Sequence, residues 1–367
     1  MKILITGSDG FIAKNLIEHL KHDKTIQLYC FSKKDSLNIL EVYLKEVDFI
    51  FHLAGVNRPK SSQEFYDGNS GLTASMVMFL KEEKRAIPIL LSSSIQATVE
   101  NDYGKSKLEA EELLLDYSKV TGAEVSIYRL PNVFGKWSKP NYNSVISTWC
   151  YNITHNIPIE VNNRETVLNL VYIDDVIENF LDNIHKKEGK NYYSISVIYQ
   201  KSLGEIEQLL YQFRDNRETL LIPKVASGFE RVLYATYLSY LPIDNFSYPL
   251  NGHQDKRGTF YEIVKTLDSG QFSLSTTAVG VTRGNHYHHS KNEKFLVVKG
   301  EALIEFRHII SDEVIAYNVS DKQMEVVEMI PGYTHNITNV GKEEMILFLW
   351  ANESFDPNNP DTYFLEV

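Results

Sequence analysis

Tyr103 and Lys107 are four residues apart in a segment that predicts a helix. Because positions i and i+4 share one face of a helix, the phenol and the ammonium can address a single site. An adjacent ammonium favours the phenolate and lowers a tyrosine pKa, which makes the phenol a usable acid near neutral pH. This spacing is common, but here it follows Ser93 and Ser94 at the end of an apolar run. Since ligands of doubly wound sheets bind at such strand ends, the combination predicts a proton-donating site.

A second feature is the turn between the first expected strand and the first expected helix, which reads Gly7-Ser8-Asp9-Gly10-Phe11-Ile12-Ala13. Gly7 permits the tight turn, Gly10 lets a pyrophosphate approach the backbone, and Ala13 allows helix and strand to pack closely. The helix N-terminus adds free N–H groups and the positive end of the helix dipole. The turn predicts a dinucleotide site with contacts from Gly7, Ser8, Gly10, Phe11 and Ile12.

The end of the second expected strand bears on the choice of dinucleotide. An NAD-selective site places an acidic residue there for the ribose 2′-hydroxyl. This chain instead has Ser32, Lys33 and Lys34, which suit a 2′-phosphate and favour NADPH. Asp35 keeps NAD open, and the two lysines alternatively belong to a solvated loop.

Another set of residues able to do chemistry lies late in the chain and comprises His286, His288, Glu293 and His335. Side chains i and i+2 of a strand point to one face, so both His286 and His288 can project into a barrel interior. Glu293 and His335, from other strands, complete a set of three nitrogens and one oxygen that suits Zn²⁺, and less selectively Fe²⁺, Mn²⁺ or Ni²⁺. The set predicts a divalent metal centre. A single histidine on a strand is more often structural, and His289 is expected to face the other way.

Two groups of elements must position these residues. Apolar runs at 2–6, 47–53, 88–92 and 124–128 predict buried strands, and helical spacing occurs at 11–20, 62–84 and 106–120. This alternation is typical of an α/β fold with a Rossmann-like, doubly wound parallel sheet. Near residue 240 the chain becomes rich in Pro, Asn, Asp and Gly, as at a domain boundary. Beyond it, seven short runs of period two predict an all-β sandwich or barrel, at 260–267, 271–279, 293–300, 301–310, 313–319, 324–330 and 344–350. We predict two domains, 1–243 and 244–367.

Composition narrows the class of protein. A chain of 367 residues with 43% hydrophobic residues can bury two cores. No run approaches the ~20 apolar residues of a membrane span, and the first residues show no secretory leader. Two cysteines are too few for a disulfide scaffold. The net charge of −11 argues against nucleic-acid or membrane-surface binding. We therefore expect a cytoplasmic protein.

Residues 1–240 resemble the extended short-chain dehydrogenase/reductase family. Three motifs of that family are matched: the glycine turn, the strand-end serines and the Tyr103-x3-Lys107 pair. Three further segments are similar to it: 52–55 to its cofactor-lining strand end, 129–135 to its RxxNxxG motif, and 172–176 to a later strand-to-helix signature. The resemblance implies that Tyr103 is the proton donor, and that Lys107 holds the cofactor ribose and lowers the Tyr103 pKa. It also implies that Ser94, with Ser93 as the alternate, hydrogen-bonds the substrate carbonyl.

The same resemblance implies further contacts. Leu53 and Ala54 would line the cofactor, and Asn132 would face the substrate. The arginine that often precedes the 172–176 segment is absent, so Lys136 or Arg164 would grip a nucleotide diphosphate instead. Only eight residues separate the strand-end serines from the catalytic tyrosine, which implies a more open pocket.

The later motifs, 280–300 and 331–339, resemble both signatures of the cupin family, whose fold is a jelly-roll barrel. The segments 255–262 and 283–288 also resemble cupin-class nucleotide-sugar epimerases, which implies that Arg283 contacts substrate. Because those enzymes commonly use a histidine base without metal, the alternative role of His286 or His288 is general base.

The fusion as a whole resembles a family of bifunctional epimerase/reductases of bacterial capsular-polysaccharide synthesis. That resemblance implies a UDP-linked 2-acetamido-2,6-dideoxy-4-keto-hexose as substrate, C3 epimerisation by the cupin, and NADPH reduction at C4 toward UDP-N-acetyl-L-fucosamine. In the alternative, the cupin is only a binding or dimerisation module with a structural metal. A homodimer is expected from the family, and the helices at 62–84 and 106–120 could form its contact.

Overall fold

The computed structural model describes residues 1–184, 189–358 and 360–367. The chain divides into two compact units: unit 1 is Met1–Leu210 with Arg231–Pro242, and unit 2 is Tyr211–Glu230 with Ile243–Val367. Residues 211–230 thus group with the later part of the chain, which differs from the predicted division. Within the described residues, no helix is both long and apolar enough to cross a membrane.

Unit 1 is built on a parallel sheet with the strand order β2-β1-β3-β4-β5-β8. Its strands are β1 (Lys2–Thr6), β2 (Gln27–Phe31), β3 (Phe49–His52), β4 (Ile89–Ser94), β5 (Val125–Leu130) and β8 (Tyr192–Tyr193). Because β2 and β3 lie on opposite sides of β1, the winding reverses between β1 and β3. A crevice for ligands forms at the carboxyl ends of strands at such a point.

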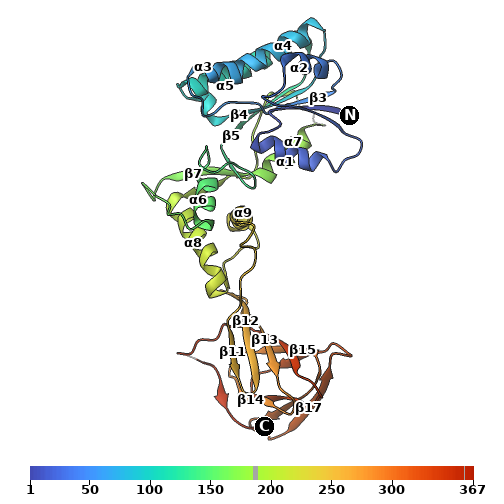
Figure 1. Ribbon diagram of the computed structural model, residues 1–367, viewed down its shortest axis with the longest axis vertical. Coiled ribbons are helices and arrows are strands. Elements are labelled where there is room, and N and C mark those ends of the chain that lie inside the picture. Colours follow the sequence, from blue (N-terminus) through green and yellow to red (C-terminus); the bar gives the residue numbers. More distant parts are fainter. Residues whose placement is uncertain (185–188, 359) are drawn as a thin grey trace. The chain divides into compact units, whose positions relative to one another are not determined.

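Helices cover both faces of this sheet (Figure 1). The helices of unit 1 and of its junction with unit 2 are α1 (Phe11–Leu20), α2 (Leu37–Leu44), α3 (Gln63–Phe65), α4 (Leu72–Glu82), α5 (Asp102–Thr121), α6 (Val145–Thr154), α7 (Ile173–Asn183), α8 (Leu203–Thr219) and α9 (Gly228–Leu238). One core packs α2, α4 and α5 against the sheet, and the other packs α1 and α7. The predicted Rossmann-like layering is confirmed.

The predicted helix at 62–84 is interrupted. A π-helix, Tyr66–Gly71, separates α3 from α4. Within it the buried Asn69 turns inward, where its amide oxygen accepts the Val56 N–H (2.8 Å) and its amide nitrogen donates to Ser106 of α5 (2.9 Å). The extra residue of the π-turn therefore brings a side chain into contact with both α5 and the loop after β3.

Unit 1 also contains a small sheet of three strands. It consists of β6 (Asn132–Phe134), β7 (Val167–Tyr172) and β9 (Tyr199–Ser202), with β6 and β7 parallel and β7 and β9 antiparallel. This sheet carries the segment expected to face the substrate.

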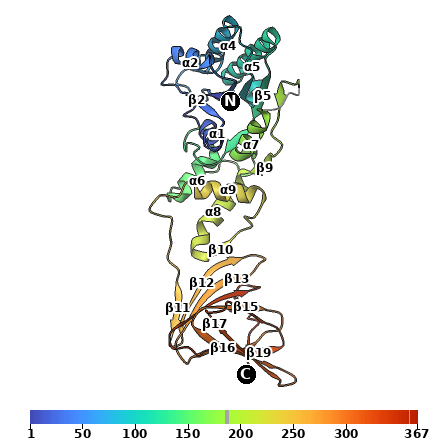
Figure 2. The same ribbon diagram turned by 90° about the vertical axis from the view of Figure 1, so that its right-hand side faces the viewer.

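Unit 2 is rich in strands and contains two sheets (Figures 1 and 2). The first has the order β10-β12-β13-β20-β15-β18, with β11 beside β12, and the second has the order β17-β16-β19-β14-β21. The strands are β10 (Leu221–Ile222), β11 (Gly252–Asp255), β12 (Gly258–Thr266), β13 (Gln271–Thr277), β14 (Thr282–Tyr287), β15 (Glu293–Lys299), β16 (Glu301–His308), β17 (Val314–Ser320), β18 (Val326–Met329), β19 (Tyr333–Asn339), β20 (Met345–Ala351) and β21 (Tyr363–Phe364).

One apolar core joins the two sheets of unit 2. Its buried residues come from both: Phe295, Val297, Val327, Met329, Met345 and Leu347 from the first, and Ala302, Ile304, Phe306, Val319 and Ile337 from the second. The strand-rich second domain is therefore confirmed, as two sheets that pack face to face and are antiparallel apart from the β10–β12 pair.

Candidate functional sites

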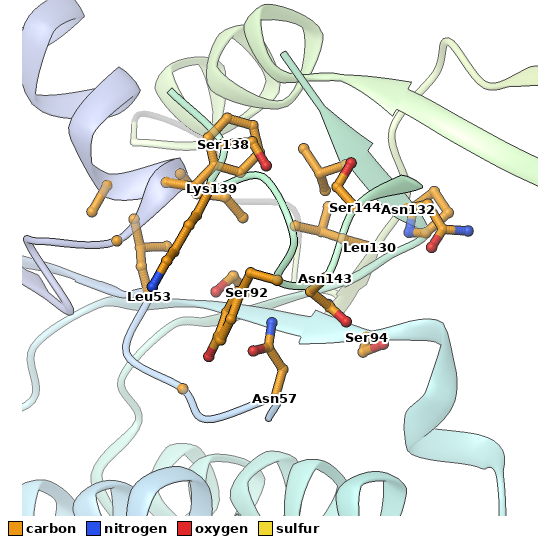
Figure 3. A pocket seen from close by; sticks show the side chains of 18 of the residues that line it. Leu53, Asn57, Ser92, Ser94, Leu130, Asn132, Ser138, Lys139, Asn143 and Ser144 are labelled. Carbon is orange, nitrogen blue, oxygen red and sulfur yellow. The ribbon is translucent and has the colours of Figure 1, made fainter. Parts of the chain in front are cut away.

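A cleft of 620 Å³ opens at the carboxyl ends of the unit 1 strands. Its lining includes the glycine turn, the ends of β3 and β4, the start of α5 and the segment around β6. Figure 3 shows Leu53, Asn57, Ser92 and Ser94 on its strand-end side, with Lys139 and Ser144 on the loop before α6. The cleft thus lies where the winding of the sheet predicts a ligand site.

The glycine turn lies against the end of β3. Gly7 has a positive φ of 68°, and a Cβ at this position would come within 2.7 Å of the Cα of Ala54. Only glycine accepts both the backbone conformation and the contact. Gly10, Phe11 and Ile12 line the cleft at the start of α1, whereas Gly7, Ser8 and Ala54 are not among its lining residues. The residues therefore fit a dinucleotide pyrophosphate, which needs this close approach to the helix N-terminus.

Tyr103, Lys107 and Ser94 line this same cleft, as the sequence predicted. Asn101 caps α5 by accepting the Gly104 N–H (2.7 Å), which places Tyr103 in the first helical turn. The Lys107 ammonium donates to the Ser92 carbonyl (3.0 Å) and lies next to Gly55, where an added Cβ would be 3.2 Å from Nζ.

Burial shifts the pKa values of both Tyr103 and Lys107. Burial raises the pKa of Tyr103, and a hydrogen bond with Ser94 opposes that rise. The Lys107 ammonium donates to the Ser92 carbonyl, and its lowering of the Tyr103 pKa stays a prediction. Burial lowers the pKa of Lys107 to about 8, against the opposing effect of Glu111. At neutral pH the phenol is therefore protonated, which is the form a proton donor requires.

Ser93 and Ser94 have different partners. The Ser93 hydroxyl donates to the fully buried carboxylate of Glu111. Glu111 also accepts from Arg129, with Nη2 at 2.6 Å, and from the Tyr192 hydroxyl at 3.2 Å. The Ser94 hydroxyl accepts the Gln96 N–H at 3.2 Å and is hydrogen-bonded to Tyr103 within the cleft, so it is not held by Glu111. This geometry favours Ser94 over Ser93 for a substrate carbonyl.

The other residues predicted to bind ligands in unit 1 lie in different places. Asn132 lines the cleft. Lys136 and Arg164 do not: Lys136 pairs with Asp174 (2.7 Å), and Arg164 pairs with Glu207.

At the end of β2, Ser32 and Lys33 also lie outside the lining residues. The Ser32 N–H donates to Asp35 (2.7 Å), and the Lys34 ammonium lies 3.6 Å from Asp9, which does line the cleft. The carboxylate that would hold an NAD ribose is therefore engaged by its own loop.

Sequence reasoning missed part of the cleft. Trp137, Lys139 and Tyr142 follow β6 and line it, with the Lys139 ammonium 5.5 Å from the centre of the Tyr142 ring. Trp137 has a positive φ of 69°, which is uncommon for a bulky residue and recurs at functional sites. In the sequence, only the two aromatic residues on either side of a lysine could have indicated that this segment lines a ligand site.

A second site lies in unit 2, where His286, His288, Glu293 and His335 come together as predicted. Their ligand atoms all lie within 4.8 Å of one another. Glu293 Oε2 is 3.7 Å from His288 Nε2 and 3.6 Å from His335 Nε2. Both of these Nε2 atoms are buried and have no hydrogen-bond partner. Buried polar atoms need a partner, and two nitrogens directed at one carboxylate fit a divalent metal ion.

The surroundings of this cluster favour deprotonated ligands. Burial lowers the pKa of His286 to about 4. Burial raises the Glu293 pKa, but the adjacent His288, His335 and Lys291 side chains outweigh that effect and hold the pKa well below its usual value. Lys291 adds an ammonium 2.9 Å from Glu293 Oε1, a contact that sequence reasoning missed.

His289 and Arg283 lie near the histidine cluster but are not part of it. His289 is exposed and outside the cluster, as predicted. Arg283, on β14, donates to the Thr276 carbonyl (3.1 Å) and lies 4.0 Å from Asp255. Its Nε is buried without a hydrogen-bond partner, so the guanidinium has a donor left for a ligand.

The fold and the first site are those of the NAD-dependent epimerase/dehydratase family, to which the chain belongs: the model of that family matches residues 3–196. A model described as polysaccharide biosynthesis C-terminal domain matches residues 253–363.

Two proteins are similar to this chain over its whole length. The UDP-2-acetamido-2,6-beta-L-arabino-hexul-4-ose reductase of Pseudomonas aeruginosa is 50% identical over 369 residues, which cover 100% of this chain and 99% of the relative. The crystal structure of the capsular polysaccharide assembling protein CapF from Staphylococcus aureus is 47% identical, with a TM-score of 0.93 and full coverage of both chains. The predicted resemblance to two-domain enzymes of capsule synthesis is thus confirmed. RMD from P. aeruginosa, complexed with NADPH, is 21% identical over 58% of this chain and 81% of its own, with a TM-score of 0.52, which shows the fold alone.

Proposed function

We propose that this chain is a bifunctional nucleotide-sugar enzyme that reduces a UDP-linked 2-acetamido-2,6-dideoxy-4-keto-hexose at C4 and epimerises it at C3. The observation that carries the reductase half is the single cleft that Tyr103, Lys107 and Ser94 share with the glycine turn. The name of the half-identical P. aeruginosa relative, a 4-ulose reductase that matches the whole chain, supports the substrate class.

In the reductase step, the substrate carbonyl would accept a hydrogen bond from Ser94 while the protonated Tyr103 phenol faces its oxygen. NADPH, when bound, would supply the hydride for C4. Tyr103 donates its proton to the oxygen as the alkoxide develops, and Lys107 holds the cofactor ribose and stabilises the phenolate that remains. We favour NADPH over NADH because Lys33 and Lys34 offer positive charge and Asp35 is held by Ser32.

The epimerase half belongs to unit 2, as a cupin. A 4-keto group acidifies the C3 hydrogen because the carbanion delocalises into an enolate. A base of unit 2 removes that proton, and a proton returns on the opposite face; His286 or His288 is that base only in the alternative in which the cluster holds no metal. A divalent metal held by the four cluster residues, Zn²⁺ by the chemistry of its ligands, would supply positive charge beside the enolate oxygen. The ketone survives this step and is then consumed by reduction, on a route to UDP-N-acetyl-L-fucosamine.

The reductase half is tested by NADPH oxidation on the UDP-linked 4-keto sugar. Replacing Tyr103 with Phe removes the proton donor and should lower kcat by about 10²–10⁴-fold. The control is Tyr66→Phe, since the Tyr66 hydroxyl makes only a 3.5 Å contact with Asp102 and lies outside the cleft lining. Equal rates for both variants would overturn the assignment of the proton donor.

The alternative for unit 2 is a binding or dimerisation module with a structural metal. The 3.7 Å approach of His288 to Glu293 is compatible with either role. Changing His288 to Ala separates them: a loss of solvent deuterium entry at C3 with intact folding supports the epimerase, and an unchanged rate supports the module. A homodimer stays a prediction.

A further inference from the structure

The residues 361–367 run beside the strand that carries His286. Here β21 pairs antiparallel with β14, with Phe364 opposite His286 and Tyr363 opposite Tyr287. Beyond β21, the Leu365 N–H donates to the Asn285 carbonyl (3.0 Å). This segment is therefore part of the sheet that carries the histidine cluster.

Asp361, at the start of this segment, caps the loop that follows β14. Its carboxylate accepts the N–H groups of His289 (2.9 Å), Ser290 (2.7 Å) and Lys291 (2.8 Å). These three residues lie between the two cluster members His288 and Glu293 in the sequence. Charge-assisted bonds to three successive N–H groups fix the loop backbone and, with it, the spacing of the two ligands.

The backbone of Asp361 acts on His288 directly. Its carbonyl oxygen is hydrogen-bonded to His288 Nδ1. A carbonyl can only accept, so Nδ1 carries the proton and Nε2 carries the lone pair. That Nε2 is the buried, unpartnered atom 3.7 Å from Glu293 Oε2. The contact thus selects the tautomer, and sets the ring orientation, that a metal ligand needs.

We propose that Asp361 is a positioning residue for the metal centre: its carboxylate fixes the 289–291 loop and its carbonyl holds His288 with Nε2 directed into the cluster. The inference rests on the metal centre in the proposed function. A merely structural tie would change the stability of unit 2 but not its affinity for metal.

The first test is the Zn²⁺ affinity of the full chain, measured by competition with a chromophoric chelator. Asp361→Ala should weaken binding by about 10–100-fold, and Asp361→Asn, which keeps one acceptor oxygen, by less. The matched control is Asp321→Ala, because the Asp321 carboxylate also caps a turn of unit 2, accepting the Gly300 N–H at 2.8 Å. Wild-type affinity in Asp361→Ala, or equal weakening in Asp321→Ala, would overturn the proposal.

The second test needs no metal. Long-range ¹H–¹⁵N spectra of the histidine rings report the tautomer of His288, which a His288→Gln variant assigns. The metal-free wild type should show a single Nδ1–H tautomer, and Asp361→Ala a mixture; the same tautomer in both would refute the positioning role. A wild-type protein that binds no Zn²⁺ would instead contradict the metal centre itself, so the two failures are distinguishable.

Discussion

Replacing Glu111 with Gln tests how much the hydrogen bonds of this buried carboxylate stabilise the strands beside the reductase cleft. The carboxylate is fully buried and accepts hydrogen bonds from Arg129, from Tyr192 and from Ser93. Gln keeps the size of the side chain but has one acceptor oxygen, and its amide N–H₂ faces groups that are themselves donors. At least one of the three donors must lose its partner.

The loss of unfolding free energy in Glu111→Gln can be calculated from these contacts. A hydrogen bond to a charged group contributes about 1.5–3 kcal/mol, and a buried donor without a partner costs about 1–3 kcal/mol. The Arg129 side chain is 29% exposed and regains some hydration, so the cost lies toward the lower end of the sum. We expect Glu111→Gln to lower the unfolding free energy of unit 1 by about 2–3 kcal/mol.

Hydrogen exchange of the amides of β4 and β5 measures this free energy for unit 1 by itself. The control is Glu112→Gln, which changes the adjacent, exposed carboxylate and should shift the exchange free energy by less than about 0.5 kcal/mol. If Glu111→Gln exchanged as slowly as wild type, the buried network would not stabilise the cleft, and the distinction drawn between Ser93 and Ser94 would lose its basis.

Three further outcomes are expected. Gly7→Ala should abolish dinucleotide binding in a calorimetric titration, since its Cβ would come within 2.7 Å of the Ala54 Cα; binding like wild type would contradict the close approach. With a folded pKa of about 8 against 10.5, Lys107 binds fewer protons in the folded than in the unfolded protein between these pH values. The free energy of unfolding therefore rises with pH through that window. Because the Lys107 ammonium that would hold the cofactor is lost over the same range, the KM for NADPH should rise above pH about 8. A flat KM profile would contradict this role of Lys107. Removal of metal should lower the melting temperature of unit 2 in wild type but not in His335→Ala, as scanning calorimetry would show.

The sequence predicted the helices and strands whose apolar residues recur at regular spacing. It missed strands in which polar site residues interrupt that spacing. The ranges of β1 and α1 agree to the residue, because apolar runs and helical spacing are local signals. The strands β14 and β19 were absent from the seven predicted runs. They carry His286 and His335 at positions where a core strand would place apolar residues, so the period-two signal disappears.

Partners distant in the sequence account for the remaining differences. The spacing of Tyr103 and Lys107 predicted one shared face, but not that Lys107 would donate to the Ser92 carbonyl. Nor does the sequence indicate that Asp361 caps a loop some seventy residues earlier. Such contacts depend on how strands pair, which no local pattern encodes.

If two separate sites act in turn on one sugar, entry of solvent deuterium must survive the loss of reduction. Tyr103→Phe protein is incubated with the UDP-linked 4-keto sugar and NADPH in D₂O, and the sugar is analysed by mass spectrometry and NMR. We expect one deuterium at C3 with almost no oxidation of NADPH. Loss of deuterium entry along with loss of reduction would contradict it, because a single site would then perform both steps.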